Sequence, residues 1–322
     1  MEIAHLHIGN SRRRKLCWLT AALFLPTVFL AAQPVSSVPR RTKVTATKSW
    51  SVRWQPNRVV NGAPVLFRVT APAPIESLSG KWLEHDVFFD LDTAKTTWYG
   101  IAGTSLQTRP GSYLLKLQAS TISGKEITFE RTITIHAAKY PRTVIQVAKQ
   151  YTEPSPEQLQ KVSQDSSLKK EAFQHVNPER EWSGKFRPPV EATVSGVFGT
   201  QRTFNGKVQS IHQGLDYAVP SGTPIAAVNS GTVLLARPLY FEGNCVVLDH
   251  GQGLLTIYMH LSEIKVKEGE KILRGEEIGL SGGSGRATGP HLHLAVRWEG
   301  IYLNPATLLR LNLPELEASS DR

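Results

Sequence analysis

The sequence is poor in cysteine, with only Cys17 and Cys245 among 322 residues. Cys17 lies in an N-terminal segment that reads as a targeting signal, so Cys245 would have no disulfide partner in the mature chain. Cys245 begins the apolar run C-V-V-L, which indicates a buried, inert thiol. The chain therefore offers no disulfide framework and no sign of an activated cysteine nucleophile.

Signals for several other function classes are also weak. The formal net charge is +10, but no cluster of basic residues interleaved with aromatics follows residue 45, so we expect no nucleic-acid partner. Ser281–Gly285 is rich in glycine but lacks the Gly-Lys-Ser/Thr of a phosphate-binding loop. We also expect no serine-hydrolase nucleophile elbow. The positive charge favours an anionic partner such as a cell-wall polymer or a membrane surface, or is simply a basic soluble surface.

The N-terminus has the pattern of an export signal. Four basic residues, Arg12 to Lys15, precede an uncharged apolar run from Leu16 to Ala32. The run is short for a membrane span and is interrupted by Pro26. We expect residues 1–38 to be a signal peptide or an uncleaved N-terminal anchor. Either would place the chain in the periplasm, the cell envelope or outside the cell, with inner-membrane anchoring as the alternative.

The rest of the chain predicts an all-β protein of two domains joined by a short helical linker. Residues 45–137 contain short alternating apolar runs separated by Gly and Pro, which is typical of a β-sandwich. Residues 188–310 repeat this pattern and predict a second β domain, followed by a tail at 311–322. In residues 138–187, Ser155-Pro156-Glu157-Gln158 is a helix-start signal. An apolar face follows it at Leu168, Ala172, Phe173 and Val176.

His212 and Asp216 lie four residues apart, with Gly214 between them. In an extended segment these three positions share one face, so the imidazole and the carboxylate project together. A helix would also align residues four apart, but Gly214 and the following Tyr-Ala-Val-Pro favour a strand. We expect Gly214 to leave room for a metal ion to approach both side chains, although such a pair also occurs by chance.

A second group of histidines lies further along the chain. Strand periodicity places His291 and His293 on one face and Leu292, Leu294, Val296 and Trp298 on the opposite, core face. His260 ends another apolar run. These histidines form either a metal or acid–base site, or an exposed pair on a solvated strand.

Zinc accounts for the whole set better than the alternatives. Catalytic zinc takes three protein ligands from His, Asp and Glu and keeps a fourth position for water. His212, Asp216 and His293 would supply nitrogen, oxygen and nitrogen to one Zn²⁺ per chain. His260 and His291 would then remain for proton transfer and for stabilising a developing oxyanion.

Three motifs in this order resemble those of the lysostaphin-type (LytM-like) zinc endopeptidases. They are His212-x-x-x-Asp216, Tyr258-x-His260 and Gly289-Pro290-His291-Leu292-His293. The resemblance covers about residues 188–310 and implies an antiparallel β peptidase domain with His212, Asp216 and His293 as zinc ligands and His260 and His291 as the catalytic pair. More weakly, residues 50–136 resemble the immunoglobulin-like N-terminal domain of some exported members.

The resemblance implies an endopeptidase that cuts peptidoglycan peptides, either stem cross-links or interpeptide bridges. Because some relatives have lost ligands, a non-enzymatic module that binds cell wall or activates an amidase is the alternative. A zinc enzyme that cleaves exported proteins is a third possibility. The sequence leaves open the bond that is cut, the oligomeric state, and whether the linker or the N-terminal domain covers the groove.

Overall fold

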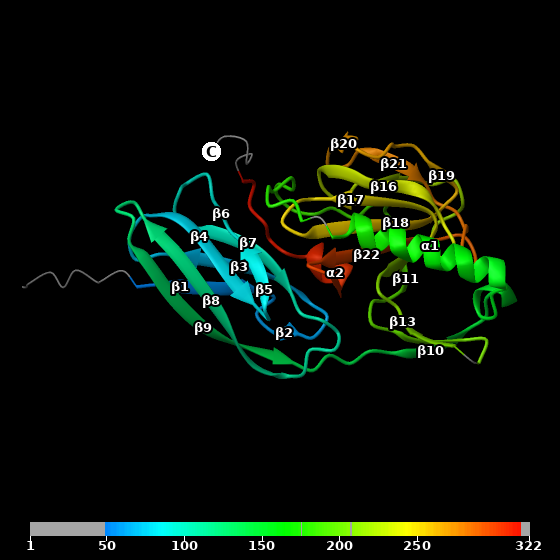
Figure 1. Cartoon of the computed structure of the whole chain (residues 1–322), viewed down its shortest axis with the longest axis horizontal. Coiled ribbons are helices and arrows are strands. Elements are labelled where there is room, and N and C mark those ends of the chain that lie inside the picture. The colour runs from blue at the N-terminus through cyan, green and yellow to red at the C-terminus, as the bar shows by residue number, and fades with distance from the viewer. Residues whose placement is uncertain (1–48, 175, 207, 317–322) are drawn as a thin grey trace, which may run out of the picture. The chain divides into compact units, whose positions relative to one another are not determined.

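The computed structural model describes residues 49–174, 176–206 and 208–316 (Figure 1). All of these residues belong to one compact unit. The predicted signal or anchor at 1–38 lies outside the described residues. Within them, no helix is both long enough and apolar enough to cross a membrane.

The described chain is built mainly of strands, which confirms the prediction of a β-rich protein. Residues 51–136 form a four-stranded and a five-stranded sheet. The first has the order β1 (Ser51–Gln55), β3 (Pro64–Thr70), β7 (Trp98–Gly103), β6 (Asp90–Leu91). The second has the order β2 (Val59–Val60), β9 (Glu126–His136), β8 (Gly111–Thr121), β4 (Ile75–Trp82), β5 (His85–Phe88).

Both of these sheets contribute buried side chains to one hydrophobic core. Val65 and Phe67 come from the first sheet, and Leu115 and Ile133 come from the second. The alternation of buried and exposed residues along β8 and β9 explains why these segments form strands with one apolar face. The immunoglobulin-like assignment of this region stays a prediction.

The segment that follows combines a helix with a short strand. Helix α1 (Pro156–Ala172) begins where the sequence predicts, because the Ser155 hydroxyl accepts from the Gln158 amide and the Gln158 side chain bonds the Ser155 amide. Strand β10 (Arg142–Ile145) and a 3₁₀ turn, η1 (Lys149–Tyr151), precede it. The sequence predicted a helical linker, but the segment also contains a strand. This strand, β10, pairs in parallel with β12 (Gln201–Phe204).

The C-terminal half is organised around one large antiparallel sheet. Its path is β11 (Val194–Gly196), β14 (Leu215–Tyr217), β22 (Leu292–Trp298), β18 (Leu254–Leu261), β17 (Gly243–Asp249), β16 (Gly231–Leu239), β20 (Lys271–Ile272), with β23 (Ile301–Leu303) beside β22. A small sheet joins β15 (Pro224–Ala226), β21 (Glu277–Leu280) and β19 (Glu263–Ile264). Another joins β10, β12 and β13 (Val208–Ile211), and α2 (Pro305–Leu308) follows β23.

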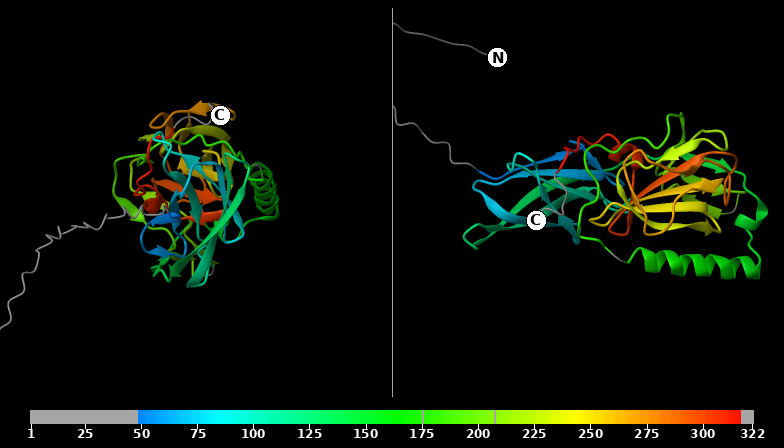
Figure 2. Two further views of the ribbon diagram at one scale, coloured as in Figure 1. Left: turned by 90° about the vertical axis from the view of Figure 1, so that its left-hand side faces the viewer. Right: turned by 90° about the horizontal axis from the view of Figure 1, so that it is seen from above.

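The large sheet buries side chains on both faces. On one face Leu292, Leu294, Val296 and Trp298 join the main core, which confirms the predicted core face of β22. On the other face a smaller apolar cluster packs against Leu168 and Ala172 of α1 and against Phe173, which caps the helix. Figure 2 shows α1 running along the outside of this half. Residues 293 and 295 of β22 point to the α1 side, so the histidine-rich site shares a sheet face with the helix.

Candidate metal centre

Strand register brings Asp216 and His293 together. Antiparallel pairing of β14 with β22 makes Asp216 and His293 direct partners, and His293 in turn pairs with Met259 of β18. His212 lies just before β14, and its backbone is anchored by the bond from its amide to the Thr200 carbonyl. Directly opposed residues in a ladder carry side chains on the same face, so the sheet itself sets the spacing of these groups.

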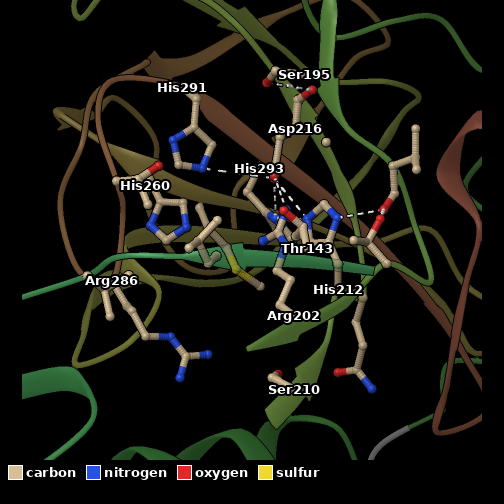
Figure 3. A pocket seen from close by; sticks show the side chains of 18 of the residues that line it. Thr143, Ser195, Arg202, Ser210, His212, Asp216, His260, Arg286, His291 and His293 are labelled. Carbon is tan, nitrogen blue, oxygen red and sulfur yellow. Dashed lines mark hydrogen bonds and ion pairs between the residues drawn. The ribbon is translucent and has the colours of Figure 1, made fainter. Parts of the chain in front are cut away.

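Three donor atoms converge in this cluster (Figure 3). His212 Nε2 lies 2.9 Å from Asp216 Oδ1 and 3.0 Å from His293 Nδ1, and His293 Nδ1 lies 2.7 Å from Asp216 Oδ1. All three residues are buried. The structure thus brings together the three residues that the sequence nominated as metal ligands.

In two of these three residues, the side-chain atom that points away from the cluster is held by another part of the chain. His212 Nδ1 lies 2.8 Å from the Val197 carbonyl oxygen, so this nitrogen carries the proton and Nε2 keeps its lone pair for a metal. Arg202 Nη2 donates to Asp216 Oδ2 over 2.5 Å, which leaves Oδ1 facing the histidines. The sequence did not predict that Val197 and Arg202 hold these side chains.

Gly214 has a different function from the one predicted. A β-carbon at this position would lie 2.3 Å from His293 Nε2 and 2.6 Å from the Leu294 carbonyl oxygen. The space above the glycine is therefore filled by the His293 ring and not kept free for a metal. The prediction failed because the residue that occupies this space comes from a strand about eighty positions away in the sequence.

The charges of the cluster suit a cation. Burial by itself would raise the pKa of Asp216, but hydrogen bonds and charge interactions with His212 and His293 outweigh it and hold this pKa well below its usual range. Burial lowers the pKa of His293, against the opposing effect of Asp216. An ionised carboxylate and neutral imidazoles are the forms that bind metal ions.

His260 reaches the cluster through an irregularity in β18. Tyr258 pairs with Val246 and Leu261 with Asn244, so two residues, Met259 and His260, oppose a single residue of β17. This is a β-bulge, and the backbone of His260 has a φ of 65°. The strand continues to Leu261, one residue beyond the run that the sequence suggested.

The bulge places His260 beside the other histidines. Its ring centroid lies 4.8 Å from that of His291 and 5.9 Å from that of His293. His260 Nδ1 bonds the Ser284 carbonyl oxygen at 2.8 Å. Burial, followed by the proximity of His293 and His291, lowers the pKa of His260 to about 3, so the ring is neutral near pH 7.

His291 lies at the edge of the cluster and is only partly buried. Its Nδ1 lies 2.8 Å from the Gly289 carbonyl oxygen, and its Nε2 lies 3.9 Å from Asp216 Oδ1. The backbone is fixed by the bridge to Gly282. All five residues nominated from the sequence therefore meet in one place, with His260 and His291 on one side of the three buried donors (Figure 3).

Other candidate nucleophiles and ligands do not belong to this site. The spacing Gly-x-Ser-x-Gly does occur around Ser281, contrary to expectation, but Ser281 is fully buried and its hydroxyl donates to the Pro220 carbonyl. Cys245 is buried, as predicted, and burial raises the pKa of its thiol. His250 is buried against the Ser230 carbonyl and the Thr256 hydroxyl and takes no part in the cluster.

Comparison with known proteins shows that the region containing the cluster matches a peptidase family. The model of Peptidase family M23 matches residues 210–305. Residues 210–305 are an M23 peptidase domain. A crystal structure of a peptidase M23 from Pseudomonas aeruginosa is similar, with a TM-score of 0.60 and 27% identity, and the match covers 79% of this chain and 96% of that one.

Two curated relatives are similar over the M23 domain. Peptidoglycan DD-endopeptidase ShyA of Vibrio cholerae serotype O1 is 45% identical over 103 residues, which is 32% of this chain and 23% of that protein. DD-carboxypeptidase/endopeptidase Mpg of Neisseria meningitidis serogroup B is 38% identical over 129 residues, which is 40% of this chain and 30% of that protein. The chain thus spans less than a third of the length of either relative.

Part of the site comes from outside the matched range of the M23 domain. The cluster lines a cavity of about 720 Å³, to which β10, β11 and β12 also contribute. In Figure 3, β10 passes in front of the cluster, and Thr143 is among the lining residues. Arg202 and Val197, which hold two of the donors, also precede residue 210. The segment joining the two halves of the chain therefore forms one wall of the groove.

Proposed function

We propose that this chain is a zinc-dependent endopeptidase that hydrolyses peptide bonds in peptidoglycan, in stem cross-links or interpeptide bridges. The observation that carries the proposal is the convergence of His212 Nε2, Asp216 Oδ1 and His293 Nδ1 in a groove that His260 and His291 also line. Similarity to an enzyme named as a peptidoglycan DD-endopeptidase supports the substrate class. That substrate lies outside the cytoplasm, which supports export to the periplasm or cell envelope.

The donor set fits one zinc ion per chain. Two imidazole nitrogens and one carboxylate oxygen are typical ligands of catalytic zinc, which keeps another position for water or substrate. When bound, zinc would supply a Lewis acid that polarises the scissile carbonyl and lowers the pKa of water. The bonds from Val197 and Arg202 to the ligands would fix their orientation and strengthen metal binding.

His260 and His291 would supply the proton transfers. His260 donates its Nδ1 proton to the Ser284 carbonyl, so Nε2 keeps the lone pair needed to accept a proton from the attacking water. His291 is positioned to donate a hydrogen bond to the oxyanion that develops on the carbonyl. Both side chains line the same pocket as the three ligands, so one bound peptide can meet all five.

The decisive test is digestion of purified peptidoglycan sacculi by the chain, with and without a zinc chelator. We expect muropeptides to be released, release to stop with the chelator and to return with added zinc. His260→Ala should lower the rate by about 10²–10⁴-fold while one zinc remains bound. His136→Ala, a histidine of β9 outside the pocket, is the matched control.

Other results would point to the alternatives. Full activity of the His260→Ala variant would overturn the assigned catalytic role. One bound zinc without release of muropeptides would favour a module that binds cell wall or activates an amidase. If a protein substrate is cleaved while sacculi stay undigested, the chain is better explained as a protease of exported proteins.

A further inference from the structure

Arg286 is held in the groove by two aromatic rings. It lies in the loop between β21 and β22, and its amide donates to the Phe241 carbonyl oxygen over 2.9 Å. The guanidinium carbon lies 4.5 Å from the centroid of the Phe241 ring and 4.7 Å from that of Phe204. Stacking on two rings restricts the long side chain to few rotamers, so its orientation is set before any ligand binds.

The guanidinium of Arg286 has no hydrogen-bond acceptor in the part of the chain that the structure describes. No carboxylate or carbonyl oxygen of residues 49–174, 176–206 or 208–316 accepts a hydrogen bond from it. Arg286 nevertheless lines the pocket, where burial lowers its pKa against the opposing effect of the nearby Glu242 carboxylate. Five N–H donors in a partly buried pocket are therefore available to a ligand.

The other charged side chains of the groove already have partners. Arg202 is paired with Asp216, and Arg142 donates its Nε hydrogen to Gln201. The Glu242 carboxylate is paired with Lys169 of α1. Arg142 keeps its charge but is exposed, whereas Arg286 is partly buried in the pocket and has no ion-pair partner among the described residues. The groove is therefore complementary to an anion that Arg286 can bind.

We propose that Arg286 binds a free carboxylate of the substrate peptide and makes the groove selective for that carboxylate over its carboxamide. This inference rests on the proposed function and names a feature of its substrate. A peptide carries free carboxylates at its C-terminus and on acidic side chains, and amidation removes that charge. A planar guanidinium with a fixed orientation matches a carboxylate through two parallel hydrogen bonds, which a carboxamide cannot accept equally well.

The position and chemistry of Arg286 favour a binding role over proton transfer. In the view of Figure 3, Arg286 and Ser195 lie at opposite ends of the pocket, and no dashed line joins Arg286 to His212, Asp216 or His293. An arginine does not release its proton at physiological pH. Arg286 would therefore fix one end of the peptide and determine specificity, while the histidines act on the scissile bond.

The test uses the zinc-loaded chain and two stem peptides that differ only in a carboxylate or a carboxamide next to the scissile bond. The dissociation constant of each peptide is measured by calorimetry, and kcat/KM is measured where turnover occurs. We expect the unmodified chain to bind the carboxylate peptide about ten- to a hundred-fold more tightly. Arg286→Gln should reduce this ratio to about one, and Arg286→Lys should give an intermediate ratio because it keeps the charge and loses the planar fork.

Arg131→Gln is the matched control, because Arg131 also stacks on an aromatic ring, Trp54, at 5.8 Å but lies in β9, outside the pocket. It should keep the full ratio. The inference would be overturned if the unmodified chain bound both peptides with equal dissociation constants. It would also be overturned if Arg286→Gln weakened the binding of both peptides equally. Digestion of sacculi is measured in parallel. If sacculi are digested but the two peptides bind equally well, only the proposed role of Arg286 is rejected. If the peptides bind differently but sacculi stay undigested, only the proposed hydrolysis of peptidoglycan is rejected.

Discussion

Arg202 Nη2 lies 2.5 Å from Asp216 Oδ2, so the guanidinium holds the carboxylate oxygen that does not face the two histidines. Without it, the carboxylate could rotate or bind through both oxygens. Both side chains are largely buried, so the pair is weakly screened by solvent. This contact fixes the orientation in which Asp216 Oδ1 faces the two histidines.

Arg202→Gln should therefore weaken metal binding by about 10- to 100-fold, as loss of a partner behind a metal ligand typically does. The affinity can be measured by competition for zinc with a chromophoric chelator. Arg142→Gln, which removes another arginine that lines the groove, should leave the affinity unchanged. Equal affinities for the Arg202→Gln variant and the unmodified chain would show that Asp216 needs no such support.

Gly214→Ala should disrupt the site because the new β-carbon would lie 2.3 Å from His293 Nε2. We expect loss of zinc binding and destabilisation of about 1–3 kcal/mol from the steric clash. Gly289→Ala is the control, since a β-carbon there meets nothing within 4 Å and Gly289 also lines the pocket. Urea unfolding and zinc content would be measured for both. Normal zinc binding by Gly214→Ala would mean that the His293 ring can move aside.

The buried His250 should make stability depend on pH. Burial lowers its pKa from 6.5 to about 4, so between these values the unfolded chain binds more protons than the folded chain. The contribution of neutral His250 to the free energy of unfolding is fully present above pH 6.5. About 3 kcal/mol of it is lost as the pH falls toward 4. His250→Gln should flatten the dependence of the unfolding free energy on pH in this window, as measured by urea titrations of the zinc-free chain. An identical slope in both chains would argue against this residue.

Strand β10 should restrict access to the groove. Asn205 clamps the chain beyond this strand, because its side chain accepts from the Val147 amide and donates to the Val147 carbonyl and the Thr152 hydroxyl. Its φ is +50°, so Asn205→Gly removes the clamp without backbone strain. We expect faster proteolysis at β10 and several-fold faster digestion of sacculi.

Asn205→Asp provides the graded control for that experiment. The aspartate tolerates the same backbone conformation and can still accept from the Val147 amide, but it cannot donate to the other two oxygens. Its rates should lie between those of the unmodified chain and of Asn205→Gly. Slower digestion by both variants would instead indicate that β10 forms a wall needed for substrate binding.

Local patterns were sufficient to predict the strands around the site and the start of α1. Alternation in β22 separated His291 and His293 from the core residues, and Ser155 with Gln158 marked the start of the helix. These features depend on residues close in sequence. The order of the three motifs and the family resemblance added the convergence of the five side chains, which periodicity alone does not give.

The contacts that were missed join distant segments. The pairing of β10 with β12 spans about sixty residues, and the exposed pattern of β10 carries no local signal for it. The bulge at His260 depends on the register of β17 against β18. Arg202 is one of many arginines in a basic chain, and only the fold shows that it reaches Asp216.

The ladder partnership of Asp216 and His293 has a consequence for how this protein can evolve. A one-residue insertion within β14 or β22 would turn a ligand to the opposite face of the sheet, so these strands cannot tolerate a change of length. Arg286 lies outside the ladder, so a substitution there leaves Asp216 and His293 in place. Descendants of this chain could thus acquire new substrates by replacing Arg286 while keeping Gly282, Ser284 and Gly289 of the same loop, which hold His260 and His291.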